Sequence, residues 1–126
     1  MTVRRWELGQ GPRRRAVPGG PIAEVVVGAD QDAGVGVVDV TVPAGAAMPE
    51  HAHGNSTTLL LPREGRLRLI ESKSGAVTEL GPGAVATIPV GLHVRLENPG
   101  ESEARMLVVL TPPDFAASVA AWPEAT

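Results

Sequence analysis

Glycine and proline divide this chain into short apolar segments, and this spacing of turn residues restricts the fold more than any other feature. They contribute 15 and 12 of the 126 residues. Between them stand runs rich in valine, leucine and isoleucine, which are typical of strands when turn residues bound them. We expect strands over residues 22–27, 35–42, 51–53, 57–61, 66–72, 77–80, 85–88, 92–97 and 105–110.

Many short strands at even spacing predict an all-β sandwich or barrel with antiparallel pairing. Helical periodicity is convincing only over residues 115–122, after Asp114, a residue type that favours helix starts. A chain of 126 residues forms one domain with a single core. We predict an extended N-terminal arm over residues 1–21, with at most a short strand near residues 3–8, and a folded domain over residues 22–126.

The composition argues against several classes of protein. The absence of cysteine excludes a disulfide framework and thiolate chemistry. No apolar run approaches the roughly 20 residues of a membrane-spanning helix, and no apolar signal-peptide segment follows Arg4 and Arg5. We therefore expect a cytoplasmic protein that does not enter a membrane. The net charge of −3 gives no electrostatic footprint for nucleic acid.

Positive charge is concentrated at the N-terminus. Residues 1–15 carry five arginines and one glutamate, whereas the rest of the chain carries six basic and thirteen acidic residues. Arg13, Arg14 and Arg15 are either a site for an anionic partner or part of a solvated arm. No aromatic residue alternates with them to stack on bases, which favours the solvated arm.

Two histidines two positions apart mark the candidate site. His51 and His53 would project to the same face of a strand, because residues i and i+2 share a face. Two imidazoles on one face suit a shared metal ion. The one other histidine is His93, which lies in a second apolar stretch.

The surroundings of these histidines resemble the two motifs of the cupin superfamily, G-x5-H-x-H-x3–4-E-x6-G and G-x5-P-x-G-x2-H-x3-N. The first motif is matched by Gly45, His51, His53 and Gly65, and the second by Gly83, Pro89, Gly91 and Asn98. The resemblance covers residues 35–112. It implies a double-stranded β-helix, the jelly-roll type of closed barrel, with its site inside the barrel.

The chain departs from these motifs at two positions where typical cupins bind metal. Thr58 stands at the place of the glutamate and Val94 at the place of the second motif's histidine. His93 is adjacent and would be the third ligand beside His51 and His53. Strand alternation, however, places His93 on the face opposite Val94, unless a bulge near Gly91 redirects its side chain.

Apolar residues of the motif strands are expected to line the barrel interior. An interior of this kind suits an apolar small molecule. The predicted pocket consists of Met48, Thr58, Leu60, Val94, Leu96 and Met106.

Two functions remain open from the sequence. In the first, a divalent transition metal (zinc, iron, nickel, copper or manganese) on His51 and His53, with His93 or water, assists dioxygenation, isomerisation or cyclisation, as the resemblance implies. In the second, a metal-free barrel binds an apolar ligand, as a sensor or as a non-redox cyclase or isomerase with a histidine as acid or base. The resemblance also implies a homodimer.

Overall fold

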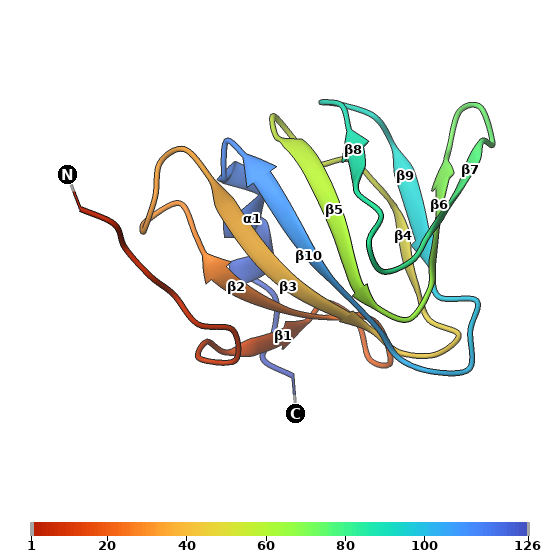
Figure 1. The fold of residues 1–126 in the computed structure, drawn as a ribbon, viewed down its shortest axis with the longest axis horizontal. Helices are drawn as coiled ribbons and strands as arrows, with labels where there is room; N and C mark the ends of the chain where they lie inside the picture. Colours follow the sequence, from red (N-terminus) through yellow and green to blue (C-terminus); the bar gives the residue numbers. More distant parts are fainter. Residues whose placement is uncertain (1, 126) are drawn as a thin grey trace.

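The computed structural model describes residues 2–125 and contains two antiparallel sheets that face each other (Figure 1). The six-stranded sheet runs in the order β1 (Arg13–Arg15), β2 (Ile22–Val27), β3 (Gly36–Val42), β10 (Ala104–Thr111), β5 (Thr57–Glu64) and β8 (Ala86–Ile88). The four-stranded sheet runs in the order β4 (Ala47–His51), β9 (Val94–Glu97), β6 (Leu67–Glu71) and β7 (Val77–Leu80). The predicted all-β barrel of the jelly-roll type is confirmed.

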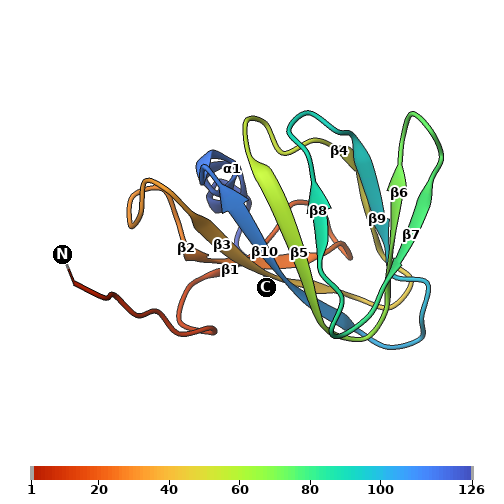
Figure 2. The same ribbon diagram turned by 45° about the horizontal axis from the view of Figure 1, so that its top comes forward.

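Residues 2–125 contain one short helix, α1 (Asp114–Ala120), which packs against β2, β3 and β10 (Figure 2). Asp114 lies in its first turn, where a carboxylate interacts favourably with the helix dipole. Ala116 and Val119 are the buried residues of this helix. Within residues 2–125, no helix is long and apolar enough to cross a membrane.

Eight of the nine predicted strands form, and the differences lie in places that matter for the site. Residues 51–53 do not form a strand of their own, because β4 ends at His51 and His53 follows in a loop. His93 lies before the start of β9 rather than inside it. No strand forms near residues 3–8.

Part of the predicted N-terminal arm belongs to the six-stranded sheet. Arg13–Arg15 form β1, which pairs with β2. The Arg14 guanidinium donates a hydrogen bond to the Trp122 carbonyl over 2.9 Å, and Arg15 Nε donates to the Gly20 carbonyl over 3.1 Å. The Arg15 amide also donates to the Pro123 carbonyl over 2.9 Å. The side chains of two of the three clustered arginines therefore hold the C-terminal segment and the β1–β2 loop in place.

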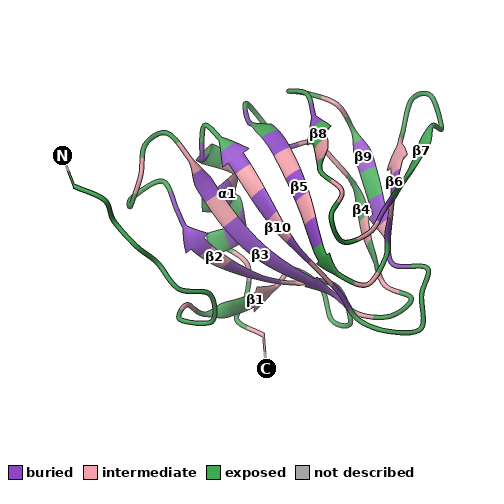
Figure 3. Ribbon diagram, in the orientation of Figure 1, coloured by how far each residue is buried: buried purple, intermediate pink, exposed green. Residues whose placement is uncertain are grey.

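The core lies between the two sheets and follows strand alternation. In β10, Ala104, Met106, Val108 and Leu110 are buried, and the residues between them are partly exposed. Figure 3 shows the same alternation of buried and intermediate residues along β5 and β10. Every second side chain along these strands points inward, so the two sheets fill the barrel from opposite walls.

Asn98 fixes the turn that follows β9. The residue is 2% exposed, and its side-chain amide nitrogen donates to the carbonyls of Val42 and Ser102 over 3.0 and 2.9 Å. Its amide oxygen accepts a hydrogen bond from the Gly100 amide over 2.9 Å. The residue thereby joins the end of β3 to the loop before β10.

We expect Asn98→Ala to lower the free energy of unfolding by about 2 kcal/mol, because buried backbone groups lose their partners. Urea unfolding measures the change. Asn55→Ala, at an exposed loop position, is the matched control and should stay within about 0.5 kcal/mol of wild type. Equal stability of the two variants would contradict the role of Asn98.

Candidate functional site

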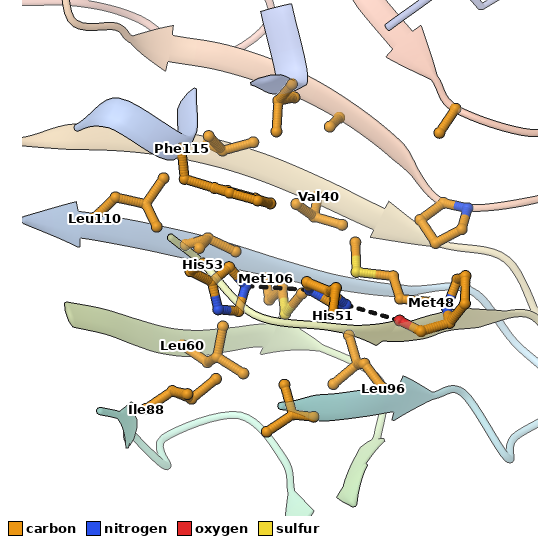
Figure 4. Close-up of a pocket in the computed structure, with 18 of the residues that line it drawn as sticks. Val40, Met48, His51, His53, Leu60, Ile88, Leu96, Met106, Leu110 and Phe115 are labelled. Atoms are coloured by element: carbon orange, nitrogen blue, oxygen red, sulfur yellow. Dashed lines mark hydrogen bonds between the residues drawn. The ribbon is translucent and has the colours of Figure 1, made fainter. Parts of the chain in front are cut away.

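A cavity of about 210 Å³ lies inside the barrel between the two sheets. Five of the six predicted pocket residues line it: Met48, Leu60, Val94, Leu96 and Met106. Figure 4 shows the cavity with side chains from both sheets and from the start of α1 around it. The lining side chains are apolar except for Glu50, His51, His53 and the indole N–H of Trp122.

A β-bulge brings His51 into the cavity. Met48 pairs with Leu96 and His51 pairs with Val94, so three steps along β4 correspond to two steps along β9. Without the extra residue, strand alternation would turn His51 to the face opposite Met48. Pro49 lies inside this irregular stretch, where its missing N–H costs no ladder hydrogen bond.

The two histidines form a hydrogen-bonded pair whose protons can be assigned. His51 Nδ1 lies 2.8 Å from the Pro49 carbonyl oxygen, which can only accept, so Nδ1 carries a proton. In the neutral ring, His51 Nε2 is then an acceptor. His53 Nε2 lies 3.2 Å from it and donates the proton between the rings. The pair is therefore a directed chain from His53 through His51 to the backbone.

His53 stays neutral at physiological pH. It is 7% exposed, and its Nδ1 is buried without a hydrogen-bond partner among the described residues. Burial disfavours the charged ring and, with a smaller contribution from the neighbouring His51, lowers the pKa of His53 from 6.5 to about 4. The cavity therefore presents a neutral imidazole rather than a cation.

Phe115, at the start of α1, packs against both imidazoles. Its ring centroid is 4.8 Å from that of His53 in an edge-to-face arrangement. It is 6.2 Å from the His51 ring, and those two planes are inclined by 19°. Figure 4 shows Phe115 beside the two histidines, on the far side from Leu60 and Ile88. The helix thus contributes an apolar cover to the histidine pair.

Thr58 does not line the cavity, and the prediction that it does was wrong. It lies on the inner face of β5 with no exposed surface, and its hydroxyl is buried without a partner within residues 2–125. The residue at the place of the family's glutamate is therefore a core residue with an unpaired polar atom. Such an atom costs stability.

Removing that hydroxyl should stabilise the protein. Thr58→Val keeps the shape of the side chain, and we expect the free energy of unfolding to rise by about 1 kcal/mol. Thr57→Val, at the exposed neighbouring position, is the control and should change little. A less stable Thr58→Val variant in urea unfolding would show that the hydroxyl does form a hydrogen bond.

His93 is not brought together with the histidine pair. Its side chain is 60% exposed, and its Nδ1 lies 3.5 Å from the Glu50 carboxylate, which is also exposed. It is not among the residues that line the cavity. The orientation agrees with strand alternation, and the predicted third metal ligand lies on the outside of the barrel.

The residues of the site fit a metal ion only in part. Two nitrogen ligands at about 2.0–2.1 Å from one ion, with a tetrahedral angle, would lie roughly 3.3 Å apart, and the two Nε2 atoms are 3.2 Å apart. However, the part of the chain from residue 2 to residue 125 contains no group of three or more histidine, cysteine, aspartate or glutamate side chains that could hold an ion.

The proton on His53 is a second obstacle to a metal ion. Binding through both Nε2 atoms would move this proton to Nδ1, which has no acceptor in the described structure. Metal-binding histidines normally donate that proton to a carboxylate, a carbonyl or water. The side chains present therefore do not fit a resident metal centre with three or four protein ligands.

Family comparison agrees with the fold and the motifs. The cupin domain profile matches residues 38–110, and the chain belongs to the cupin family. A comparison with curated protein sequences finds no significant match.

Several solved structures share the fold. KdgF from Halomonas sp. matches with a TM-score of 0.74 and 16% identity, over 88% of this chain and 94% of that chain. An uncharacterised Klebsiella pneumoniae protein with a double-stranded β-helix domain matches with a TM-score of 0.69 and 22% identity, over 81% and 85%. An oxalate decarboxylase variant from Bacillus subtilis matches with a TM-score of 0.76 and 20% identity, over 94% of this chain and 32% of that one. These identities support a common fold and nothing finer.

Segments near the two chain ends provide a part of the cavity wall that lies outside the predicted pocket. Phe115, Val119 and Trp122 line the cavity, as do Ala16 and Val17 of the β1–β2 loop. The spacing of the first three residues, four and then three positions, is that of one helix face. That spacing was visible in the sequence, but the motifs do not reach residue 115.

Proposed function

We propose that this protein binds an uncharged, apolar small molecule inside the barrel, without a resident metal ion. The observation that carries the proposal is the chemistry of the cavity wall. No lysine or arginine of the described chain lines it, and both cavity histidines are engaged with each other. An organic anion would find no cationic partner there, whereas an apolar molecule would exchange water for aliphatic side chains.

The size of the cavity supports a ligand of this class. A cavity of roughly 150 Å³ lined by leucine, isoleucine and phenylalanine is enough to hold benzene. The barrel offers about 210 Å³ between side chains such as Leu60, Ile88 and Leu110. A compact one- or two-ring molecule, or a short branched chain, is the expected occupant.

Titration with naphthalene, followed by the fluorescence of the ligand, tests the proposal. We expect saturable binding of one molecule per chain. Val94→Phe places a ring in the cavity and should abolish saturable binding, because Val94 is buried in the wall. Val77→Phe makes the same change at an exposed strand position and should bind as wild type does. Equal binding by both variants, with folding checked by circular dichroism, would overturn the proposal.

The metal-assisted enzyme is the second candidate, and the 3.2 Å separation of the two Nε2 atoms favours it. Here His51 and His53 would hold one ion, which would polarise a substrate oxygen. Calorimetric titration with zinc tests this function. Binding that is tight in wild type and lost in His51→Ala would support it, whereas weak binding that His51→Ala leaves unchanged would exclude it.

The homodimer and the cytoplasmic location are predictions that follow from the family and the composition. Light scattering at working concentration measures the first. A monomeric mass would show that the resemblance to dimeric cupins does not extend to assembly.

A further inference from the structure

A bound molecule would be expected to form hydrogen bonds with the histidine pair. The ring nitrogens that remain available for hydrogen bonding therefore decide the ligand class. His51 uses Nδ1 on the Pro49 carbonyl and Nε2 on His53. His53 uses Nε2 on His51. In Figure 4 the dashed lines join these groups in one unbroken chain.

The one remaining ring nitrogen is closed to a ligand as well. His53 Nδ1 is without accessible surface and without a partner in residues 2–125, although the His53 ring lines the cavity. A molecule in the cavity therefore meets ring carbons of His53 and not this nitrogen. Phe115 packs on both rings and adds further apolar surface at the same end.

We infer that the histidine pair offers a ligand no hydrogen bond, because three of its ring nitrogens are engaged and the fourth is buried away from the cavity, so that the ligand is hydrocarbon-like at this end of the cavity. This inference rests on the proposed binding function. A hydroxyl group placed beside the pair would lose its hydrogen bonds to water and gain none. The cost of an unpaired buried polar group corresponds to roughly tenfold or more in affinity.

The other polar groups of the wall do not change this conclusion. Glu50 is exposed and contacts His93 on the outer side of the barrel. The Trp122 indole provides a donor but no acceptor, so it cannot receive the proton of a ligand hydroxyl. Apart from the Glu50 carboxylate, no side chain of the described wall offers a strong acceptor to such a hydroxyl unless the hydrogen bond between the two histidines is broken.

Breaking the hydrogen bond between the two histidines gives a prediction that a site without polar groups would not share. His53→Phe removes the proton donor and leaves the His51 Nε2 lone pair without a partner. We expect the variant to bind 2-naphthol about three- to tenfold more tightly relative to naphthalene than wild type does. His53→Leu is a second variant that opens the same lone pair if the phenyl ring disturbs folding.

The experiment compares naphthalene with 2-naphthol, which differ by one hydroxyl, on wild type, His53→Phe and His93→Ala. The inference predicts at least about tenfold weaker binding of 2-naphthol to wild type and to His93→Ala, and a smaller difference in His53→Phe. Binding of 2-naphthol to wild type that equals or exceeds that of naphthalene would overturn the inference while leaving the proposed function intact. Failure of both molecules to bind would overturn the proposed function itself, and the inference with it.

Discussion

Acidification from about pH 7 to about pH 4 should destabilise the wild-type protein by roughly 3 kcal/mol more than the His53→Phe variant. The physical cause is the buried imidazole, whose pKa falls from 6.5 in the unfolded chain to about 4 in the folded protein. Between these two values the unfolded chain binds a proton that the folded protein rejects, so the free energy of unfolding decreases as the pH falls. At about 1.36 kcal/mol per pH unit, the interval corresponds to roughly 3 kcal/mol.

Urea unfolding at a series of pH values measures this difference. The extra slope should begin just above pH 6.5 and level off below about pH 4, because both states are then protonated. His93→Ala removes an exposed histidine and should retain the slope. A His53→Phe variant with the same pH dependence as wild type would show that His53 is not buried as a neutral group.

Gly65→Ala should destabilise the protein by about 3 kcal/mol or more. Gly65 has φ of +73°, and an added Cβ would lie 2.9 Å from the Glu103 carbonyl oxygen and 3.0 Å from Ala104 Cα. The left-handed conformation alone costs an alanine about 1–2 kcal/mol. The contacts with backbone atoms next to β10 add to this, because neither side can move without disturbing strand pairing.

Gly75→Ala separates the two contributions. Gly75 has nearly the same φ, +75°, but an added Cβ would meet nothing within 4 Å. We expect this variant to lose only about 1–2 kcal/mol in thermal or urea unfolding. If both variants lost the same amount, the close approach of the β5–β6 turn to β10 would have no energetic role.

The barrel itself could be predicted from local signals. Glycines at motif positions, among them Gly45 and Gly65, adopt positive φ, and the short runs between turns became strands. Alternation along single strands was enough to place Leu60, Leu96 and Met106 in the cavity, because period two holds wherever a strand is regular.

The site was less predictable because its geometry depends on irregular backbone. His51 and His53 do meet in the cavity, but not as neighbours on one face of a strand. His51 reaches it through a bulge, and His53 reaches it from the loop beyond β4. A bulge depends on pairing with β9, which lies more than forty residues away, so the local sequence could not show it.

Thr58 illustrates a different limit. Alternation correctly turns it inward, but inward positions near a barrel wall can be sealed by neighbours rather than open to the cavity. The motifs also could not predict that Phe115 and Trp122 line the cavity. The C-terminal helix reaches the cavity only through tertiary packing against distant strands.

Elemental analysis of protein purified without an affinity tag decides whether the cavity is an apolar binding site whose histidines bind each other rather than a metal ion. We expect far less than one transition-metal ion per chain, before and after incubation with zinc followed by dialysis, together with intact naphthalene binding. About one ion per chain, retained through dialysis and lost in His51→Ala, would show that the two histidines hold a metal ion.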